Sequence, residues 1–313
     1  MAESIILIII SGGDIASTNQ AESLLEKCEW LNGPLVEGYR SWSRNCVRIW
    51  WRDGGVLFED NLELRWEKET GEKVSEVIFP SRHVAASGFP CLTIHPIGVP
   101  QYRSDETPPF GGKSGGAPPP SSRMSAWMQE LKNQVKIHKL EDEFTISFET
   151  THHGPWLNVP CLFIEIGSTE EKWGHKTAAS ALADVMINGL NLNSQKEVPL
   201  IQSEKVVFCL GGGHYAPQPM RLSDKGIVLG HMLANYALKM EKDGDADDEN
   251  NLNNLKGTWK QAIIAAYDST KQANPSSEVW AYLDRKSFKG WQRKAIIDFL
   301  EVEKIPYGRT ADF

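Results

Sequence analysis

The chain has 313 residues, of which 41% are hydrophobic and 24% are charged, and its formal net charge is −8. This composition excludes a wholly disordered chain, and the negative balance argues against nucleic-acid binding through the whole surface, although not through a local basic patch. The length suits one large α/β domain or two smaller ones. We expect a single hydrolytic domain over residues 1–313.

The first apolar run, residues 5–10, predicts a buried strand rather than a signal peptide. Glu3 stands where a signal peptide carries basic residues, and no small-residue cleavage site follows. No apolar segment is long enough to span a bilayer. The five cysteines are scattered and form no CxxC pair. We therefore expect reduced core cysteines in an intracellular protein.

Further apolar runs rich in Ile, Val and Phe predict strands, several of them buried on both faces. These runs are 47–51, 76–81, 91–96, 144–150, 161–167, 205–211 and 278–284. Apolar residues at three- and four-residue spacing predict helices at 21–31, 124–140, 170–190, 225–240, 255–272 and 291–303. Ser168 and Glu171 predict a capping box that opens the 170–190 helix. The alternation predicts a three-layer α/β sandwich with a mostly parallel or mixed sheet.

Two segments have a different composition. Residues 107–123 are rich in Pro, Gly and Ser, which predicts a long flexible loop that tolerates deletion. Residues 241–251 are acidic, which predicts a solvated surface insertion.

Four polar clusters stand at or just after the ends of apolar runs. They read "HPIG" (95–98), "THHGP" (151–155), "EIGSTEE" (165–171) and "GGGHY" (211–215). Ligands of open α/β sheets bind outside the carboxyl ends of the strands, so parallel strands would bring these clusters to one edge. Glu165 lies inside an apolar run, where a carboxylate is costly unless it is paired or bound to a metal. His83, which follows "PSR", is a further candidate for this edge.

Each histidine also has a structural interpretation. His95 precedes a proline, which favours an extended turn. His152 and His153 point to opposite faces if the backbone is extended, so we do not expect both to bind one metal. The remaining histidines, at 138, 175 and 231, lie on helical patterns and are expected at the surface or in partner contacts.

The pattern of reactive residues favours hydrolysis by an activated water. The chain has no phosphate-binding loop, no GxGxxG fingerprint, no HExxH pair and no GxSxG elbow. Histidines stand with a carboxylate, and no serine or cysteine nucleophile is evident. The glycines at 211–213 let a ligand approach the backbone closely, and their N–H groups could stabilise an oxyanion.

A basic stretch near the C-terminus, "DRKSFKGWQRK" (284–294), is typical of nucleic-acid contacts. Its cations contact phosphates, and its two aromatic residues, Phe288 and Trp291, can stack on unpaired bases. The alternative is an amphipathic helix with a solvated basic face. The cations are Arg285, Lys286, Lys289, Arg293 and Lys294.

The motifs "HPIG", "THHGP", "FIEIGSTEEKW", "GGGHYAP" and "DRKSFKGWQ", in this order, resemble the archaeal and plant type of D-aminoacyl-tRNA deacylase. The resemblance covers nearly the whole chain. It implies a zinc-associated α/β fold similar to peptidyl-tRNA hydrolases and nucleoside phosphorylases. The implied activity is hydrolysis of the ester in D-aminoacyl-tRNA, including aldehyde-modified D-aminoacyl-tRNA, in translation quality control.

The resemblance also implies roles for single residues. It implies catalysis by His214, His153 and Glu165, and zinc binding by His152, His214 and Glu165. It implies the aminoacylated 3′ end of tRNA as the partner, with neither DNA nor a membrane, and a cytoplasmic and also nuclear location. Contacts to tRNA are expected from His95, Gly211, Gly212, Gly213, Tyr215, Arg285, Lys286, Lys289 and Trp291.

Two other functions stay open at this point. One is a non-catalytic tRNA-binding module with a structural zinc, but such a module has no need of a buried carboxylate among histidines. The other is a zinc peptidase-like hydrolase, although the chain lacks the helix-borne ligand pairs of known zinc peptidases.

Overall fold

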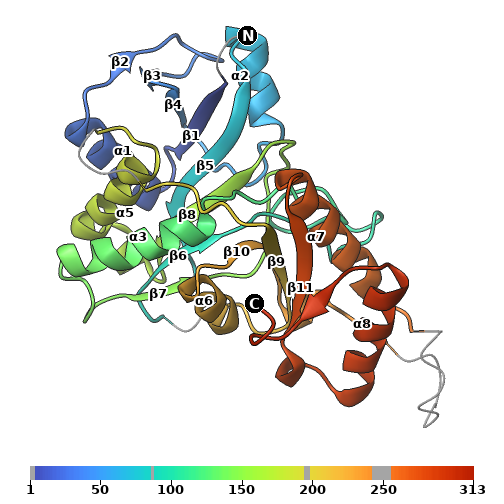
Figure 1. Cartoon of the computed structure of the whole chain (residues 1–313). Coiled ribbons are helices and arrows are strands. Elements are labelled where there is room, and N and C mark those ends of the chain that lie inside the picture. Colours follow the sequence, from blue (N-terminus) through green and yellow to red (C-terminus); the bar gives the residue numbers. More distant parts are fainter. Residues whose placement is uncertain (1–3, 86–87, 194–197, 242–254) are drawn as a thin grey trace.

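The computed structural model describes residues 4–85, 88–193, 198–241 and 255–313, and two β-sheets dominate it (Figure 1). The large sheet has the strand order β2-β3-β4-β1-β5-β8-β6-β7, and the small sheet has the order β10-β9-β11-β12. The large sheet consists of β1 (Ile5–Ser11), β2 (Leu31–Asn32), β3 (Ser41–Arg44), β4 (Val47–Arg52), β5 (Val74–Arg82), β6 (Cys91–His95), β7 (Thr145–Phe148) and β8 (Cys161–Gly167). The small sheet consists of β9 (Lys205–Leu210), β10 (Val228–Leu233), β11 (Glu278–Leu283) and β12 (Tyr307–Gly308). The expected α/β class with a mixed sheet is confirmed.

The centre of the large sheet changes direction between β8 and β6. Strands β4, β1, β5 and β8 pair in parallel, whereas β6 pairs with β8 antiparallel and with β7 in parallel. The carboxyl ends of β6 and β8 therefore lie at opposite edges. Glu165 of β8 stands level with Ser81 of β5 and Thr93 of β6, inside the sheet. The expectation that parallel strands carry the polar clusters to one edge is wrong.

Helices cover both faces of the large sheet. One face is covered by three helices, α1 (Ile15–Lys27), α3 (Met124–Ile137) and α5 (Lys176–Gly189), which share a core with Ile6, Ile8 and Ile10 of β1. The other face is covered by α2 (Leu62–Thr70), which shares a core with Ile5, Leu7 and Ile9 of the same strand. This explains why the first run is apolar at every position. Helices α7 (Trp259–Ala273) and α8 (Gly290–Val302) pack on the small sheet (Figure 1). Short helices complete the chain at α4 (Glu170–Trp173), α6 (Pro217–Asp224), η1 (Asn235–Ala237) and η3 (Arg285–Ser287).

Three local predictions are wrong. Helix α1 begins at Ile15, because the Asp14 side chain accepts hydrogen bonds from the backbone N–H groups of Ala16 and Ser17. The predicted 225–240 helix contains strand β10, and His231 on that strand is fully buried rather than exposed. The capping box at Ser168 does not form, because its hydroxyl donates to Phe89 O (2.6 Å).

The Pro/Gly-rich segment 107–123 is irregular but packed. Residues 117–121 are buried, and Pro119 O accepts a hydrogen bond from Cys161 N of β8 (3.0 Å). Pro118 O lies 3.1 Å from His231 Nε2. Burial of residues 117–121 argues against the expected flexible loop, whereas the expectation that deleting part of 107–123 costs little stability stays a prediction. Most of the acidic segment 241–251 lies outside the described residues.

In the part of the chain that the structure describes, no helix is long and apolar enough to cross a membrane.

We expect Gly111→Ala to destabilise the fold more than Gly38→Ala does. Both glycines have positive φ (73° and 82°), so both alanines pay a backbone cost of about 1–2 kcal/mol. A Cβ at Gly111 would also lie 1.8 Å from Leu57 O, whereas a Cβ at Gly38 would meet nothing within 4 Å. The clash should add about 1–3 kcal/mol. Denaturant unfolding of both variants measures the difference, and equal losses would show that the packing of 107–123 is not tight.

Candidate active site

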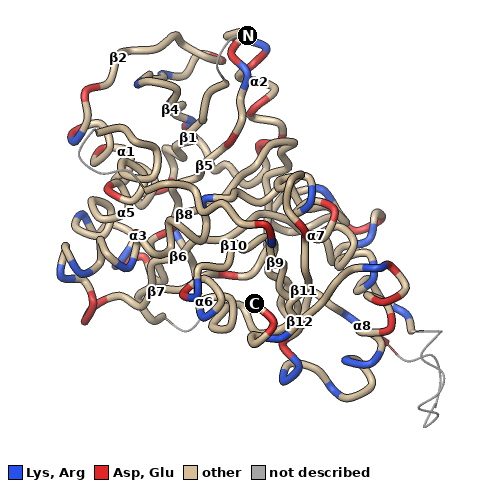
Figure 2. The backbone as a smooth tube through the Cα atoms, in the orientation of Figure 1, with Lys and Arg blue, Asp and Glu red and all other residues tan. Residues whose placement is uncertain are grey.

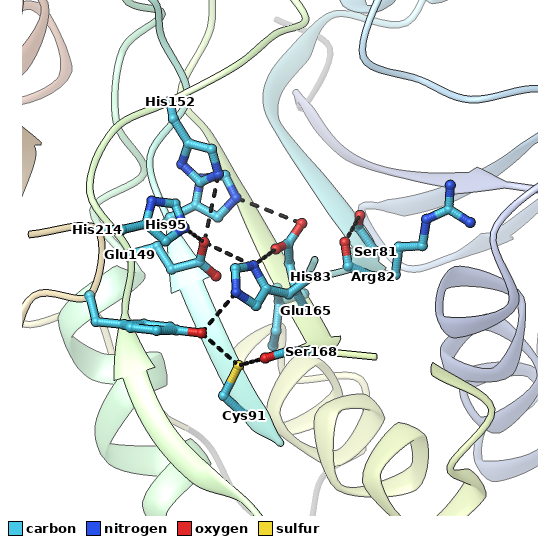
Figure 3. Close-up of polar contacts among 12 residues, drawn as sticks. Ser81, Arg82, His83, Cys91, His95, Glu149, His152, Glu165, Ser168 and His214 are labelled. Carbon is cyan, nitrogen blue, oxygen red and sulfur yellow. Dashed lines mark hydrogen bonds and ion pairs between the residues drawn. The ribbon is translucent and has the colours of Figure 1, made fainter. Parts of the chain in front are cut away.

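The polar cluster lies over β8, on the face of the large sheet that α2 covers. Glu165 and Phe163 are two residues apart, so they share a face, and Phe163 belongs to the core that contains Trp66 of α2. The His95 ring stacks on Phe163 with centroids 5.1 Å apart. The histidine cluster, as we call it, comprises His83, His95, Glu149, His152, His153, Glu165 and His214. Figure 3 draws most of these residues.

The junction between the two sheets assembles the cluster. The segment after β7 donates from Glu149 N to Ile94 O (3.1 Å) and from Thr150 N to His214 O (2.9 Å). Thr151 N donates to Met232 O of β10 (2.7 Å). One short segment thus bonds to β6, to the glycine turn after β9 and to β10. It brings the "THHGP" and "GGGHY" motifs together.

Three histidine rings form a compact group. Ring centroids lie 4.2 Å apart for His95 and His152, 4.8 Å for His95 and His153, and 4.2 Å for His152 and His153. Their nitrogens can be chosen so that all lie within 4.8 Å of one another. The expectation that His152 and His153 point apart is wrong, because His153 has a φ of 43° and the backbone is not extended there.

The hydrogen bonds of this group define its tautomers. Each Nδ1 contacts a backbone carbonyl: Pro96 O for His95 (3.1 Å), Thr150 O for His152 (2.7 Å) and Gly154 O for His153 (2.8 Å). A carbonyl only accepts, so each Nδ1 carries the hydrogen and each neutral ring has its lone pair on Nε2. Burial and the neighbouring His95 lower the pKa of His153 to about 4 and hold the pKa of His152 well below its usual value.

Glu149 is the centre of the second group. Its side chain is fully buried, and its Oε2 lies 2.8 Å from His214 Nε2, 3.0 Å from His83 Nδ1 and 3.6 Å from His152 Nε2 (Figure 3). Burial alone would raise the pKa of Glu149, but the contacts with His214 and His83 outweigh burial and hold it well below its usual value. The carboxylate is therefore charged and faces three imidazoles.

Glu165 and His83 join the two groups. Glu165 Oε1 lies 3.7 Å from His95 Nε2, and its Oε2 lies 3.6 Å from His83 Nδ1. On its other side, His83 Nε2 lies 3.0 Å from the Tyr215 hydroxyl. Burial opposes the charged form of His83, but contacts with Cys91 and the two glutamates raise its pKa above the usual value. The buried carboxylate predicted at Glu165 is thus paired with histidines.

The glycine turn holds His214 at the edge of the cluster. Gly211 has a φ of 106°, and a Cβ there would lie 2.8 Å from the Phe288 ring. Gly211 N donates to Leu233 O (2.8 Å) and Gly212 N donates to Ser287 Oγ (2.7 Å). These two N–H groups are therefore already bonded, which corrects the predicted three-donor oxyanion site. Of the N–H groups of the three described glycines 211–213, that of Gly213 alone has no such partner.

The basic stretch lies beside the glycine turn. Ser287, in η3, receives the bond from Gly212, while Lys286 and Lys289 are exposed. Figure 2 shows Lys and Arg along the chain near α6 and α8, next to the small sheet. Phe288 is only 8% exposed and packs in the core of this sheet, so it is not free to stack on a base. The predicted cations are thus placed near the site, and the predicted role of Phe288 is wrong.

The donor set fits a metal ion. Among the described residues, His95 Nε2 and both carboxylate oxygens of Glu149 are buried without a hydrogen-bond partner. The close contacts of Glu149 with His83, His152 and His214 are ion pairs rather than hydrogen bonds. Imidazole and carboxylate are common metal ligands. The predicted ligands His152, His214 and Glu165 fall into three different candidate metal-binding groups. Only the group of His95, His152 and His153, among the three found in the described residues, consists of histidines alone.

Sequence reasoning missed two residues of the site. Glu149 sits at the end of the predicted 144–150 strand, so the argument applied to Glu165, a carboxylate beside an apolar run, would have found it. Tyr236 places its hydroxyl 3.2 Å from His214 Nδ1 and 3.4 Å from Thr150 Oγ1. The sequence did not predict Tyr236 as a site residue, because it lies outside the polar motifs and within the predicted 225–240 helix.

The fold and the cluster together define an α/β protein with a candidate hydrolytic, metal-binding site at the junction of two sheets. Residues 70–308 match the D-aminoacyl-tRNA deacylase family. The chain belongs to this family.

Similar proteins support the assignment over different lengths. A D-aminoacyl-tRNA deacylase of Arabidopsis thaliana is 45% identical over 313 residues, which cover 98% of this chain and 99% of the relative. A D-aminoacyl-tRNA deacylase of Pyrococcus furiosus is 32% identical over 235 residues, which cover 74% of this chain and 80% of the relative. The crystal structure of a conserved protein of unknown function has the same fold, with a TM-score of 0.77 and 23% identity over 100% of this chain and 97% of that chain.

Proposed function

We propose that the protein hydrolyses the ester between a D-amino acid and the 3′ end of tRNA, releasing the amino acid and the tRNA. The observation that carries this proposal is the buried Glu149 facing three histidines in a chain whose relatives are named for this reaction. Hydrolysis of aldehyde-modified D-aminoacyl-tRNA, and a cytoplasmic and nuclear location, are further parts of the proposal that rest on the family resemblance alone.

The metal we propose is zinc, held by the Nε2 atoms of His95, His152 and His153. When bound there, zinc would supply a water of lowered pKa and polarise the ester carbonyl. The rings of His152 and His153 are kept neutral, which is the form that binds metals. Burial opposes the charged form of His95, but contact with Glu165 raises its pKa, so zinc would have to displace a proton from that ring. Glu165 adds negative charge 3.7 Å from His95 Nε2.

The proton path we propose runs through His214. Its Nε2 faces Glu149, so the acceptor nitrogen is Nδ1, which lies 3.2 Å from the Tyr236 hydroxyl. His214 takes the proton from the attacking water, and the Glu149 carboxylate stabilises the imidazolium. The Tyr236 hydroxyl passes a proton to the ribose oxygen as the ester bond breaks. Among the three glycines, we assign the N–H of Gly213 as the donor to the oxyanion.

Two observations weigh against the other functions. A tRNA-binding module gains nothing from two buried glutamates that face histidines. A zinc peptidase-like hydrolase of the helix-borne type does not fit either, because the cluster comes from strand ends and turns.

The function is tested by deacylation of matched D- and L-tyrosyl-tRNA by the purified protein, before and after chelation. We expect turnover of the D-ester, little turnover of the L-ester, loss of activity with chelator and recovery with added Zn²⁺. Hydrolysis of both esters at equal rates would contradict D-specificity. Full activity in a protein shown to be metal-free would contradict the zinc assignment.

We expect the basic stretch to bind the tRNA backbone without taking part in the chemistry. The double variant Lys286→Glu, Lys289→Glu should raise KM and reduce the salt dependence of KM, because phosphate contacts release counterions. The value of kcat should change less than about twofold, since these contacts bind the ground and transition states alike. Equal salt slopes for the variant and the parent would show that these lysines do not contact phosphates.

A further inference from the structure

Four aromatic side chains are exposed among the described residues, and all four belong to segments that contact the active site. They are Phe58 (68% exposed), Phe89 (72%), Phe110 (62%) and Tyr236 (47%), and we call them the aromatic rim. Exposed apolar side chains on segments that contact a reactive site are candidates for holding a ligand.

Hydrogen bonds and close packing tie the rim to the cluster. Gly154, the residue after His153, donates its N–H to Phe110 O (3.0 Å). A Cβ on Gly111 would lie 3.4 Å from the Cα of Phe58, so the two loops that carry Phe58 and Phe110 are in direct contact. The turn that holds His153 is thus packed between these loops.

The other two rim residues lie beside the opposite parts of the cluster. The Tyr236 hydroxyl lies 3.2 Å from His214 Nδ1. The Phe89 carbonyl accepts from Ser168 Oγ (2.6 Å), and Ser168 Oγ lies 3.2 Å from Cys91 Sγ in the network around Tyr215. The segments that carry these two residues therefore contact the His214 and Tyr215 parts of the active site.

We propose that Phe58 and Phe110 form a stacking site for the unpaired bases at the 3′ end of the substrate RNA. This inference rests on the proposed function. The reacting ester is attached to the terminal ribose, so an ester placed at His153 and His214 brings the terminal bases toward the loops that pack against the turn of His153. Stacking on aromatic side chains is the usual way in which proteins hold unpaired RNA bases.

The charge around the site fits the same occupant. Exposed Lys286 and Lys289 lie on the segment that bonds to the glycine turn through Ser287, where they can hold the backbone phosphates of the same strand. Beside the rim, the loop of Phe110 carries exposed Lys113, whereas Phe58 is followed by Glu59 and exposed Asp60. We expect the bases on the rim, and the phosphates on Lys113 and on the basic stretch.

The test measures binding of two fluorescent RNA hairpins by anisotropy. One hairpin ends in four unpaired nucleotides, ACCA-3′, and the other has the same stem with a blunt end. We expect the parent to prefer the overhang. Phe58→Ala and Phe110→Ala should each weaken overhang binding at least about fivefold and leave blunt-end binding and the salt slope unchanged. Phe110→Trp should retain the preference, because tryptophan stacks at least as well.

Ile137→Ala is the matched control, since Ile137 is 66% exposed at the end of α3, on the other face of the large sheet. The same variants are assayed with D-tyrosyl-tRNA, where we expect a raised KM and an unchanged kcat. A parent without overhang preference, or alanine variants that bind the overhang like the parent, would overturn the inference even if the protein is a deacylase. Loss of overhang binding in the variants of a protein without deacylase activity would uphold the stacking site and reject the proposed function.

Discussion

We expect Glu149→Gln to lower kcat on D-tyrosyl-tRNA by about 10²–10⁴-fold, the range typical of a lost acid–base partner. The buried carboxylate lies within 3.6 Å of nitrogens of three histidines, and it is held in its charged form. Glutamine keeps the shape of the side chain but removes the charge that stabilises the imidazolium of His214. The value of KM should change little, because Glu149 is buried and does not contact the bulk of the tRNA.

Glu63→Gln is the control for this variant. Glu63 is also a fully buried glutamate, and it accepts hydrogen bonds from Asn158, away from the histidine cluster. We expect Glu63→Gln to leave kcat within about threefold of the parent, because it removes no group of the proton path. Melting temperatures of both variants separate a loss of chemistry from a loss of folding. A Glu149→Gln variant that folds and retains parental kcat would remove Glu149 from the mechanism.

Most strands could be predicted from the sequence, because runs such as 5–10 and 161–167 are apolar on both faces and helices cover both sides of the sheet. The segment 225–240 shows the limit of this reasoning. Its apolar residues also fit helical spacing, and only pairing with β9 decides that Val228–Leu233 is a strand. Strand direction was equally hidden, since nothing in the residues of β6 shows that it runs opposite to β8.

The membership of the site could be predicted better than its geometry. Glu165 and the histidines of the motifs do come together, and a buried carboxylate beside an apolar run is a sound signal. The cause differs from the prediction, because the cluster is assembled by the segment 149–151 at the junction of two sheets. The sequence also did not predict that His152 and His153 belong to one candidate metal group, because this depends on the positive φ of His153.

The packing of 107–123 could not be predicted from its composition. Proline and glycine are as common in flexible linkers as in tightly packed loops. Here the glycines are required by close contact: a Cβ on Gly112 would lie 2.9 Å from Val99 Cγ2, and one on Gly154 would lie 2.3 Å from Gly112 N. Such contacts join segments that are far apart in sequence, so only the folded chain shows them.

The most direct test of the account is a double-mutant cycle on kcat with His214→Ala, Glu165→Gln and the double variant. His214 and Glu165 do not need to touch, because Glu149 and His83 link them: His83 Nδ1 lies 3.0 Å from Glu149 and 3.6 Å from Glu165. If the cluster acts as one unit, the double variant should be about as slow as the slower single variant. His214→Ala should fold because His214 lies in a turn, whereas Glu165→Gln takes one carboxylate partner from His83, which keeps its 3.0 Å contact with Glu149. The melting temperatures of all three proteins must therefore be measured beside kcat. Losses that multiply in the double variant, or full activity of His214→Ala, would contradict a single site built on this cluster.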